Sequence, residues 1–163
     1  MSNLITTVFY VGRLPWAPGT FGSLAALPMA YLLHRYCGFP VFFALTVLVF
    51  LIGWLATFTA TWGRSDHDPS AIVIDEVVGQ WIALWPLSAG LWHAGVDPAI
   101  SPYPGWIAAF ILFRFFDILK PWPVSWADKK TTALGVMLDD VLAGVLAAIC
   151  VSALAWYAHS GAL

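Results

Sequence analysis

Residues 41–62, VFFALTVLVFLIGWLATFTATW, form an apolar stretch without a charged side chain. A helix of about 20 apolar residues is long enough to cross the hydrocarbon core of a bilayer. The composition agrees, because 61% of the 163 residues are hydrophobic, 10% are charged and the mean hydropathy is +0.82. Soluble domains carry about 25% charged residues. The sequence therefore predicts an integral membrane protein, and we expect residues 1–163 to form a single domain.

Other apolar segments lie on both sides of this stretch. Residues 24–33 form a short one that His34 and Arg35 end, and longer ones cover residues 72–92, 106–119 and 133–157. The connectors 63–70, 93–105 and 121–132 hold most of the Pro, Gly and polar residues, so we expect them to be loops. The pattern predicts an all-α, polytopic transmembrane bundle of about four to five spans.

The basic residues indicate how such a bundle lies in the membrane. If five helices alternate in direction, residues 12–22, 63–71 and 120–132 fall on one side, and the basic residues of that side are Arg13, Arg64, Lys120, Lys129 and Lys130. The opposite side has only Arg35. The positive-inside rule then makes the first side cytoplasmic.

Two acidic pairs each open a long apolar segment. They are Asp75-Glu76 in IDEVV (74–78) and Asp139-Asp140 in LDDVL (138–142), and both predicted helices leave the cytoplasmic side in the same direction. One alternative is that these acids only complement the helix dipoles. Because an acid at membrane depth costs about 2.5–3.5 kcal/mol, we expect the pairs to face a polar interior. Carboxylate oxygens suit Mg²⁺, which makes all four residues candidate metal ligands.

A third group of charges lies in FRFFDILKP (113–121), where Arg114, Asp117 and Lys120 are spaced three residues apart along one helical stripe. Pro121 should end this helix. Arg114 and Lys120 are candidates for binding phosphate, since guanidinium offers a bidentate fork and ammonium a point charge. The alternative is that Arg114 only neutralises Asp117 inside the membrane.

A turn-forming stretch, APGTFGS (17–23), precedes the first apolar segment. Thr20 could cap the following helix, in which case the stretch needs no other role. On the acidic side of the bundle, its backbone N–H groups could instead bind a phosphate oxygen, which makes Gly19, Thr20 and Ser23 candidates. Asp68 and His67, in the connector before the first acidic pair, are secondary candidates.

The sequence argues against other classes of protein. Its net charge of −2 and the absence of a basic run longer than Lys129-Lys130 give no surface for nucleic acid. No Cys is followed six positions later by Arg, so the chain is not a cysteine-nucleophile phosphatase. Asp66-His67-Asp68 lacks the α/β scaffold that an aspartate-nucleophile phosphatase of the haloacid dehalogenase type requires.

Together, four stretches resemble the phosphatidylglycerophosphatase A family in the same order along the chain. They are APGT (17–20) with Gly22 and Ser23, Asp68 with IVIDEVVG (72–79), FRFFDILKPWP (113–123) and GVMLDDVLAG (135–144). The resemblance implies an all-helical, Mg²⁺-dependent enzyme of the bacterial inner membrane. It implies removal of the terminal phosphate of phosphatidylglycerophosphate, giving phosphatidylglycerol and inorganic phosphate in phospholipid biosynthesis.

In the resulting hypothesis, Asp75, Glu76, Asp139 and Asp140 hold Mg²⁺, while Asp117 orients a water molecule or completes the metal shell. Either water or one of the carboxylates would attack phosphorus. Arg114 and Lys120, with the turn at Thr20, would offset charge on the transferring phosphoryl group. The alternatives are a lipid phosphotransferase of the CDP-alcohol type, whose Asp-Gly-x-x-Ala-Arg core is absent, and a small ion transporter with intramembrane carboxylates.

Overall fold

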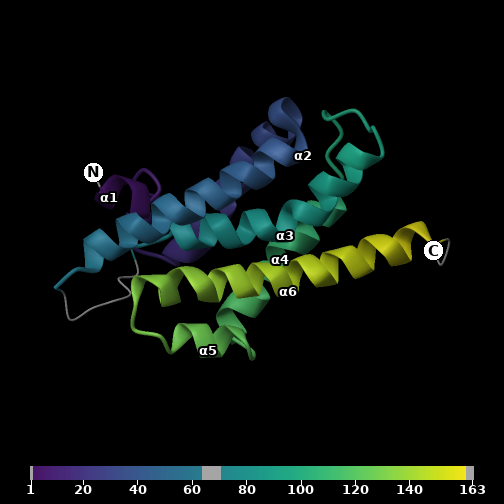
Figure 1. Cartoon of the computed structure of the whole chain (residues 1–163). Coiled ribbons are helices and arrows are strands. Elements are labelled where there is room, and N and C mark those ends of the chain that lie inside the picture. Colours follow the sequence, from purple (N-terminus) through teal and green to yellow (C-terminus); the bar gives the residue numbers. More distant parts are fainter. Residues whose placement is uncertain (1, 64–70, 161–163) are drawn as a thin grey trace.

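The fold is known from a computed structural model that describes residues 2–63 and 71–160. Within these ranges every regular element is a helix, which confirms the all-α class (Figure 1). In chain order they are α1 (Ser2–Thr6), the 3₁₀ helix η1 (Val11–Arg13), α2 (Pro18–Thr61), α3 (Ile74–His93), α4 (Tyr103–Leu119), α5 (Val124–Asp128) and α6 (Ala133–His159).

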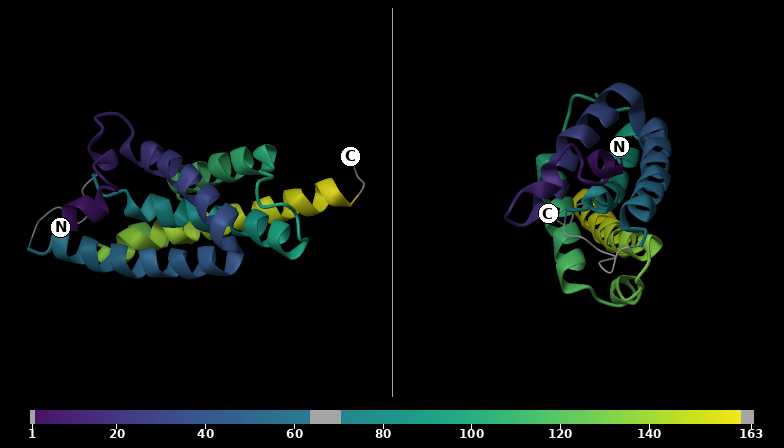
Figure 2. Two further views of the ribbon diagram at one scale, coloured as in Figure 1. Left: turned by 90° about the horizontal axis from the view of Figure 1, so that it is seen from above. Right: turned by 90° about the vertical axis from the view of Figure 1, so that its left-hand side faces the viewer.

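Helix α2 is a hairpin of two helical arms, because the chain reverses at Gly38 (Figure 2, left). Gly38 has φ 71° and ψ 172°, a conformation that residues with a side chain rarely adopt. A Cβ atom at Gly38 would also lie 3.2 Å from Nε1 of Trp92. The predicted end of the first segment at His34-Arg35 is therefore wrong. His34 stays inside the helix, because its buried Nδ1 forms a 2.8 Å hydrogen bond with Oγ of Ser88 on α3.

Two helices, α2 and α6, are long and apolar enough to cross a membrane. In the most apolar part of α2 only 28% of the residues are buried within the protein, unlike a core helix of a soluble domain. Large side chains such as Leu48, Leu51 and Leu55 lie on its outer face. A surface of this kind is expected to contact lipid.

Helices α3 and α6 pack closely at the centre of the bundle. Their backbones meet at two glycines, since a Cβ atom on Gly144 would lie 2.4 Å from the carbonyl oxygen of Gly79. A Cβ atom on Gly79 would in turn clash with Phe113 of α4 and with the backbone of Asp140. Small residues at a crossing let two helices approach closely, as in many membrane proteins.

The connector 121–132 is not entirely a loop as predicted, because it contains α5. This short helix packs on α6, with Val124 and Ala127 fully buried. The burial of these two positions, three residues apart on one helical face, stabilises the segment in spite of the flanking Pro121 and Pro123. The predicted end of the preceding helix is confirmed, since α4 stops at Leu119, before Pro121.

The glycine contact gives a first testable prediction. Gly144→Ala should force α3 and α6 apart and lower the free energy of unfolding by about 1–3 kcal/mol, as overpacking does in other cores. Gly90→Ala is the matched control on α3, because Gly90 is exposed with no atom within 4 Å of its added Cβ. Denaturant unfolding in detergent measures both variants. Equal stability of Gly144→Ala and the control would show that the helices do not depend on this contact.

Candidate active site

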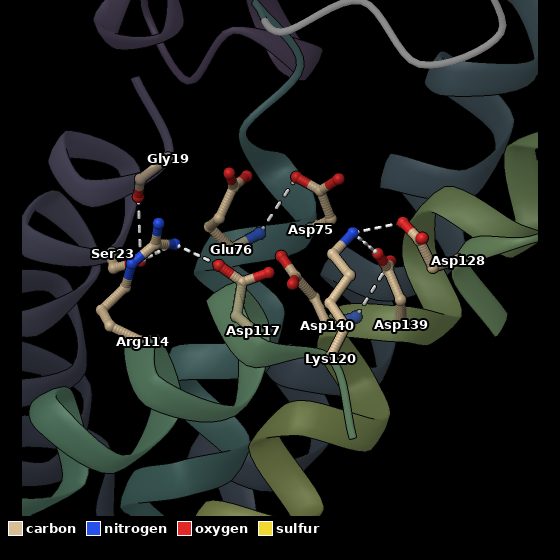
Figure 3. A network of polar contacts seen from close by, with 10 residues as sticks. All are labelled: Gly19, Ser23, Asp75, Glu76, Arg114, Asp117, Lys120, Asp128, Asp139 and Asp140. Carbon is tan, nitrogen blue, oxygen red and sulfur yellow. Dashed lines mark hydrogen bonds and ion pairs between the residues drawn. The ribbon is translucent and has the colours of Figure 1, made fainter. Parts of the chain in front are cut away.

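A polar cavity of about 310 Å³ lies at one end of the bundle, where α2, α3 and α6 begin and α4 ends. Its lining residues come from all four helices and the segments beside them: Ala17, Pro18, Gly19, Ile72, Asp75, Glu76, Arg114, Asp117, Lys120, Asp139 and Asp140. The sequence predicted that the motifs would converge, and the described structure does bring them together (Figure 3).

Three carboxylates form the centre of this cavity. Asp75 and Glu76 come from the first turn of α3, and Asp140 comes from α6. One oxygen of each lies within 4.8 Å of the others. Asp75 and Asp140 are 6% and 3% exposed, and Oε2 of Glu76 is buried without a hydrogen-bond partner among the described residues. Three acids at this spacing, two of them buried and Glu76 partly buried, repel one another unless a cation lies between them.

Asp139, the fourth predicted ligand, has a different partner in the structure. Its Oδ2 accepts a 2.9 Å hydrogen bond from Nζ of Lys120, and its Oδ1 accepts one from the backbone N–H of Asp140. It still lines the cavity. Asp139 therefore lies beside the group of three carboxylates and joins that group to Lys120.

The guanidinium group of Arg114, a residue of α4, lies beside the start of α2. Its Nη1 is 2.7 Å from Oδ2 of Asp117 and 3.4 Å from Oγ of Ser23, which itself donates to the carbonyl oxygen of Gly19 (Figure 3). The guanidinium Nε is buried without a partner in the described part of the chain. The pairing of Arg114 with Asp117, the alternative to phosphate binding, is thus present, and the guanidinium also lines the cavity.

Lys120 leaves the helical stripe that its spacing predicted. It follows the last residue of α4 in a left-handed conformation, with φ 45° and ψ 54°, which turns the side chain towards α5 and α6. There its ammonium bonds to Asp128 and Asp139. Burial alone would lower the pKa of Lys120, but these two carboxylates outweigh that effect and raise the pKa above its usual value. Lys120 is therefore a cation at the rim of the cavity.

Asp128 is the residue of this network that the sequence analysis missed. It ends α5, eight residues after Lys120, inside a segment predicted to be a loop. A helical pattern in 124–128, with Val124 and Ala127 on one face, was the signal that could have placed it near Lys120.

The APGT turn brings its backbone to the acids. Helix α2 begins at Pro18 and its N-cap is Ala17, so the prediction that Thr20 caps the helix is wrong. The N–H of Thr20 donates to the carbonyl oxygen of Ala17. Gly19 lines the cavity, and a Cβ atom there would lie 2.2 Å from Oε1 of Glu76. Asp68 and His67 lie outside the described residues.

A site with buried carboxylates beside two cations in an all-helical bundle fits a phosphatase that is built on helices and not on an α/β scaffold. The comparisons with known proteins agree. The family model described as phosphatidylglycerophosphatase A matches residues 4–155. The chain therefore belongs to the phosphatidylglycerophosphatase A family, as the four motifs indicated.

Similar proteins carry related names. Phosphatidylglycerophosphatase A of Haemophilus influenzae is 38% identical over 157 residues, covering 95% of this chain and 89% of that protein. The protein of the same name from Escherichia coli is 35% identical over 153 residues, covering 91% and 81%. A Bacteroides thetaiotaomicron protein named "Putative phosphatidylinositol-3-phosphatase" is 39% identical over 160 residues, covering 94% and 92%. No solved structure matches the chain.

Gly19 gives a second prediction. Gly19→Ala should displace the Glu76 carboxylate and crowd Arg114, whose Nη1 would lie 3.2 Å from the new Cβ atom. A misplacement of about 1 Å in an active site lowers the rate about 100-fold, so we expect a loss of that order in phosphate release. The fold should persist, because the displaced atom ends a flexible side chain. Phosphatase assays beside circular dichroism test this, with Gly90→Ala as control. Full activity of Gly19→Ala would show that the turn does not shape the cavity.

Proposed function

We propose that this protein hydrolyses the terminal phosphate of phosphatidylglycerophosphate, giving phosphatidylglycerol and inorganic phosphate. The observation that carries the proposal is the convergence of Asp75, Glu76 and Asp140 with Arg114 in one cavity. Acids that hold a divalent cation and a guanidinium that binds phosphate are the parts that phosphoryl transfer needs. Family membership and the names of two relatives support the same substrate.

The three central carboxylates fit a Mg²⁺ ion. They are hard oxygen donors from two neighbouring helices, and Oε2 of Glu76 has no other partner among the described residues. Asp139 lies beside them, held by Lys120, as a further ligand or as support for the others. When bound, the ion would offset the negative charge of the phosphoryl group and make a water molecule more acidic.

The remaining residues would bind and orient the phosphate. Arg114 would direct its guanidinium at a phosphoryl oxygen, held in place by Ser23 and Asp117. Gly19 is the second residue of α2, so its backbone N–H has no partner within the helix and can donate to the phosphate. Figure 3 shows Asp117 between Arg114 and Asp140, where its carboxylate could orient the attacking water.

We further propose that the bundle crosses the bacterial inner membrane five times. The two arms of α2, together with α3, α4 and α6, would be the crossing segments, and α4 with 17 residues is the shortest. Its length of about 25 Å is close to the thickness of the hydrocarbon core. Arg13, Lys129 and Lys130 would place the cavity end on the cytoplasmic side, opposite Arg35. The acyl chains of the substrate would then stay in the bilayer.

Neither alternative function is favoured. The family match covers residues 4–155 and is to a phosphatase, not to a phosphotransferase of the CDP-alcohol type. A transporter would be expected to carry its intramembrane carboxylates near the middle of the bilayer. Here the acids gather at one end of the bundle, in the first turn of α3 and about two turns into α6.

The proposed function is tested by phosphate release from phosphatidylglycerophosphate with purified protein. We expect activity with Mg²⁺, none with excess chelator, and recovery when Mg²⁺ is restored. Phosphatidylinositol 3-phosphate, assayed in parallel, should be hydrolysed far more slowly. Asp140→Asn keeps the shape of the side chain but removes a central charge, so it should abolish activity and weaken Mg²⁺ binding.

Asp97→Asn is the matched control for that variant, because Asp97 is an exposed acid in the segment between α3 and α4. It should retain full activity. A wild-type protein that releases phosphate equally well with chelator would contradict the metal site. Preference for the inositol lipid would contradict the proposed substrate.

The orientation in the membrane gives a further prediction. In a variant with Cys37 and Cys150 replaced by alanine, single cysteines are introduced at the exposed positions Thr131 and Ser101. A membrane-impermeant maleimide should label the first only in inverted vesicles and the second only in intact spheroplasts. Labelling of both cysteines from the same side would show that the chain does not cross the membrane an odd number of times between residues 101 and 131.

A further inference from the structure

Lys120 is held from two sides by carboxylates on different helices. Its ammonium bonds to Asp139 of α6 at 2.9 Å and to Asp128 at the end of α5 (Figure 3). An ammonium group has three N–H donors, so these two partners leave one. Lys120 lines the cavity together with Arg114, so its ammonium lies beside the proposed phosphate site with one donor unused.

The position of Asp128 is fixed by the packing of α5. Val124 and Ala127, one and four residues into α5, are fully buried against α6. On the outer side of α5, Nζ of Lys130 lies 3.9 Å from the centre of the Trp126 ring. The five-residue helix is thus held on α6, and its last residue reaches back to the end of α4.

Asp128 also changes the balance of charge around Lys120. Without it, the ammonium would have Asp139 as its single carboxylate partner, and attraction to the acids of the cavity would draw it towards them. With it, the ammonium is held at the rim, between Asp139 on one side and α5 on the other. A long, flexible lysine side chain otherwise has many rotamers and no fixed direction.

We propose that Asp128 is the positioning residue for Lys120, and that it sets the affinity of the site for the phosphate group by holding the ammonium where its third N–H meets a phosphoryl oxygen. The inference rests on the proposed function of this cavity. Asp128 does not itself touch the phosphate. The pair contributes little to stability, since the two side chains are 31% and 38% exposed.

The test compares Asp128→Asn with wild type for hydrolysis of phosphatidylglycerophosphate and for inhibition by inorganic phosphate. Loss of an outer partner typically lowers activity about 10- to 100-fold, so we expect a fall of that size in kcat/KM. Phosphate should inhibit the variant correspondingly less, while the unfolding midpoint stays unchanged. Asp128→Glu, which keeps the charge, should recover part of the loss, and Asp97→Asn should behave as wild type.

A double-mutant cycle separates positioning from a general effect of charge. If Asp128 acts through Lys120, adding Asp128→Asn to Lys120→Met should cause no further loss in kcat/KM. Losses that multiply in the double variant would overturn the proposal. So would wild-type kinetics and phosphate inhibition in Asp128→Asn.

Binding of inorganic phosphate, followed by the ³¹P line width in the presence of the protein, distinguishes this proposal from the proposed function. Phosphate binding that weakens in Asp128→Asn, in a protein that releases no phosphate from the lipid, would contradict the proposed function and support the positioning role. Hydrolysis of the lipid by a protein whose phosphate binding is unaffected by Asp128→Asn would support the proposed function and contradict the positioning role.

Discussion

The close contact of α3 with α6 is the constraint on which the site depends. The two backbones touch where Gly79 meets Gly144. Asp75 precedes the first glycine by four residues and Asp140 precedes the second by four, so each acid lies about one helical turn from the contact. Since the helices leave the same end of the bundle, the turn before the contact brings acids of both into one cavity. A side chain at either glycine would separate the helices and the carboxylates with them.

Bringing carboxylates together in a largely apolar bundle is unfavourable, and the surrounding residues offset that cost unequally. Arg114 pairs with Asp117, and Lys120 is shared between Asp139 and Asp128. No ion pair within the described residues reaches Asp75, Glu76 or Asp140. Each outer acid therefore has one of the protein's own cations as a partner, while the central three acids have none among the described residues. This division explains why a divalent cation is the simplest partner for the centre, and phosphate for the unused donors of Arg114 and Lys120.

Much of this arrangement could be predicted from the sequence, because it depends on local patterns. Charge-free stretches and acidic pairs are visible in single segments, and the i, i+3 spacing of Arg114 and Asp117 correctly places their side chains together. The expectation that both acidic pairs open their helices holds for Asp75-Glu76 but not for Asp139-Asp140, which lie about two turns into α6 because that helix already begins at Ala133. The misses depend on contacts between segments or on backbone conformation. The helix continues past His34 because the imidazole forms a hydrogen bond with Ser88, which is distant in the sequence. Lys120 leaves the stripe of Arg114 and Asp117 because its backbone adopts a left-handed conformation. Helix α5, and with it Asp128, forms because two small apolar residues pack on α6.

The position of the cavity also matches the shape of the proposed substrate. A lipid phosphate ester has a strongly polar end and two apolar chains, so an enzyme that binds it must offer polar groups beside an apolar surface. Here the polar groups occupy one end of the bundle, and α4, which carries Arg114 and Asp117 inward, exposes Ile111, Phe115 and Ile118 on its outer face. These outer positions are spaced four and three residues apart, so they form one apolar stripe. In the proposed function, one helix would thus present charge to the phosphate and hydrocarbon to the surrounding lipid, and the substrate would not need to leave the bilayer to reach the acids.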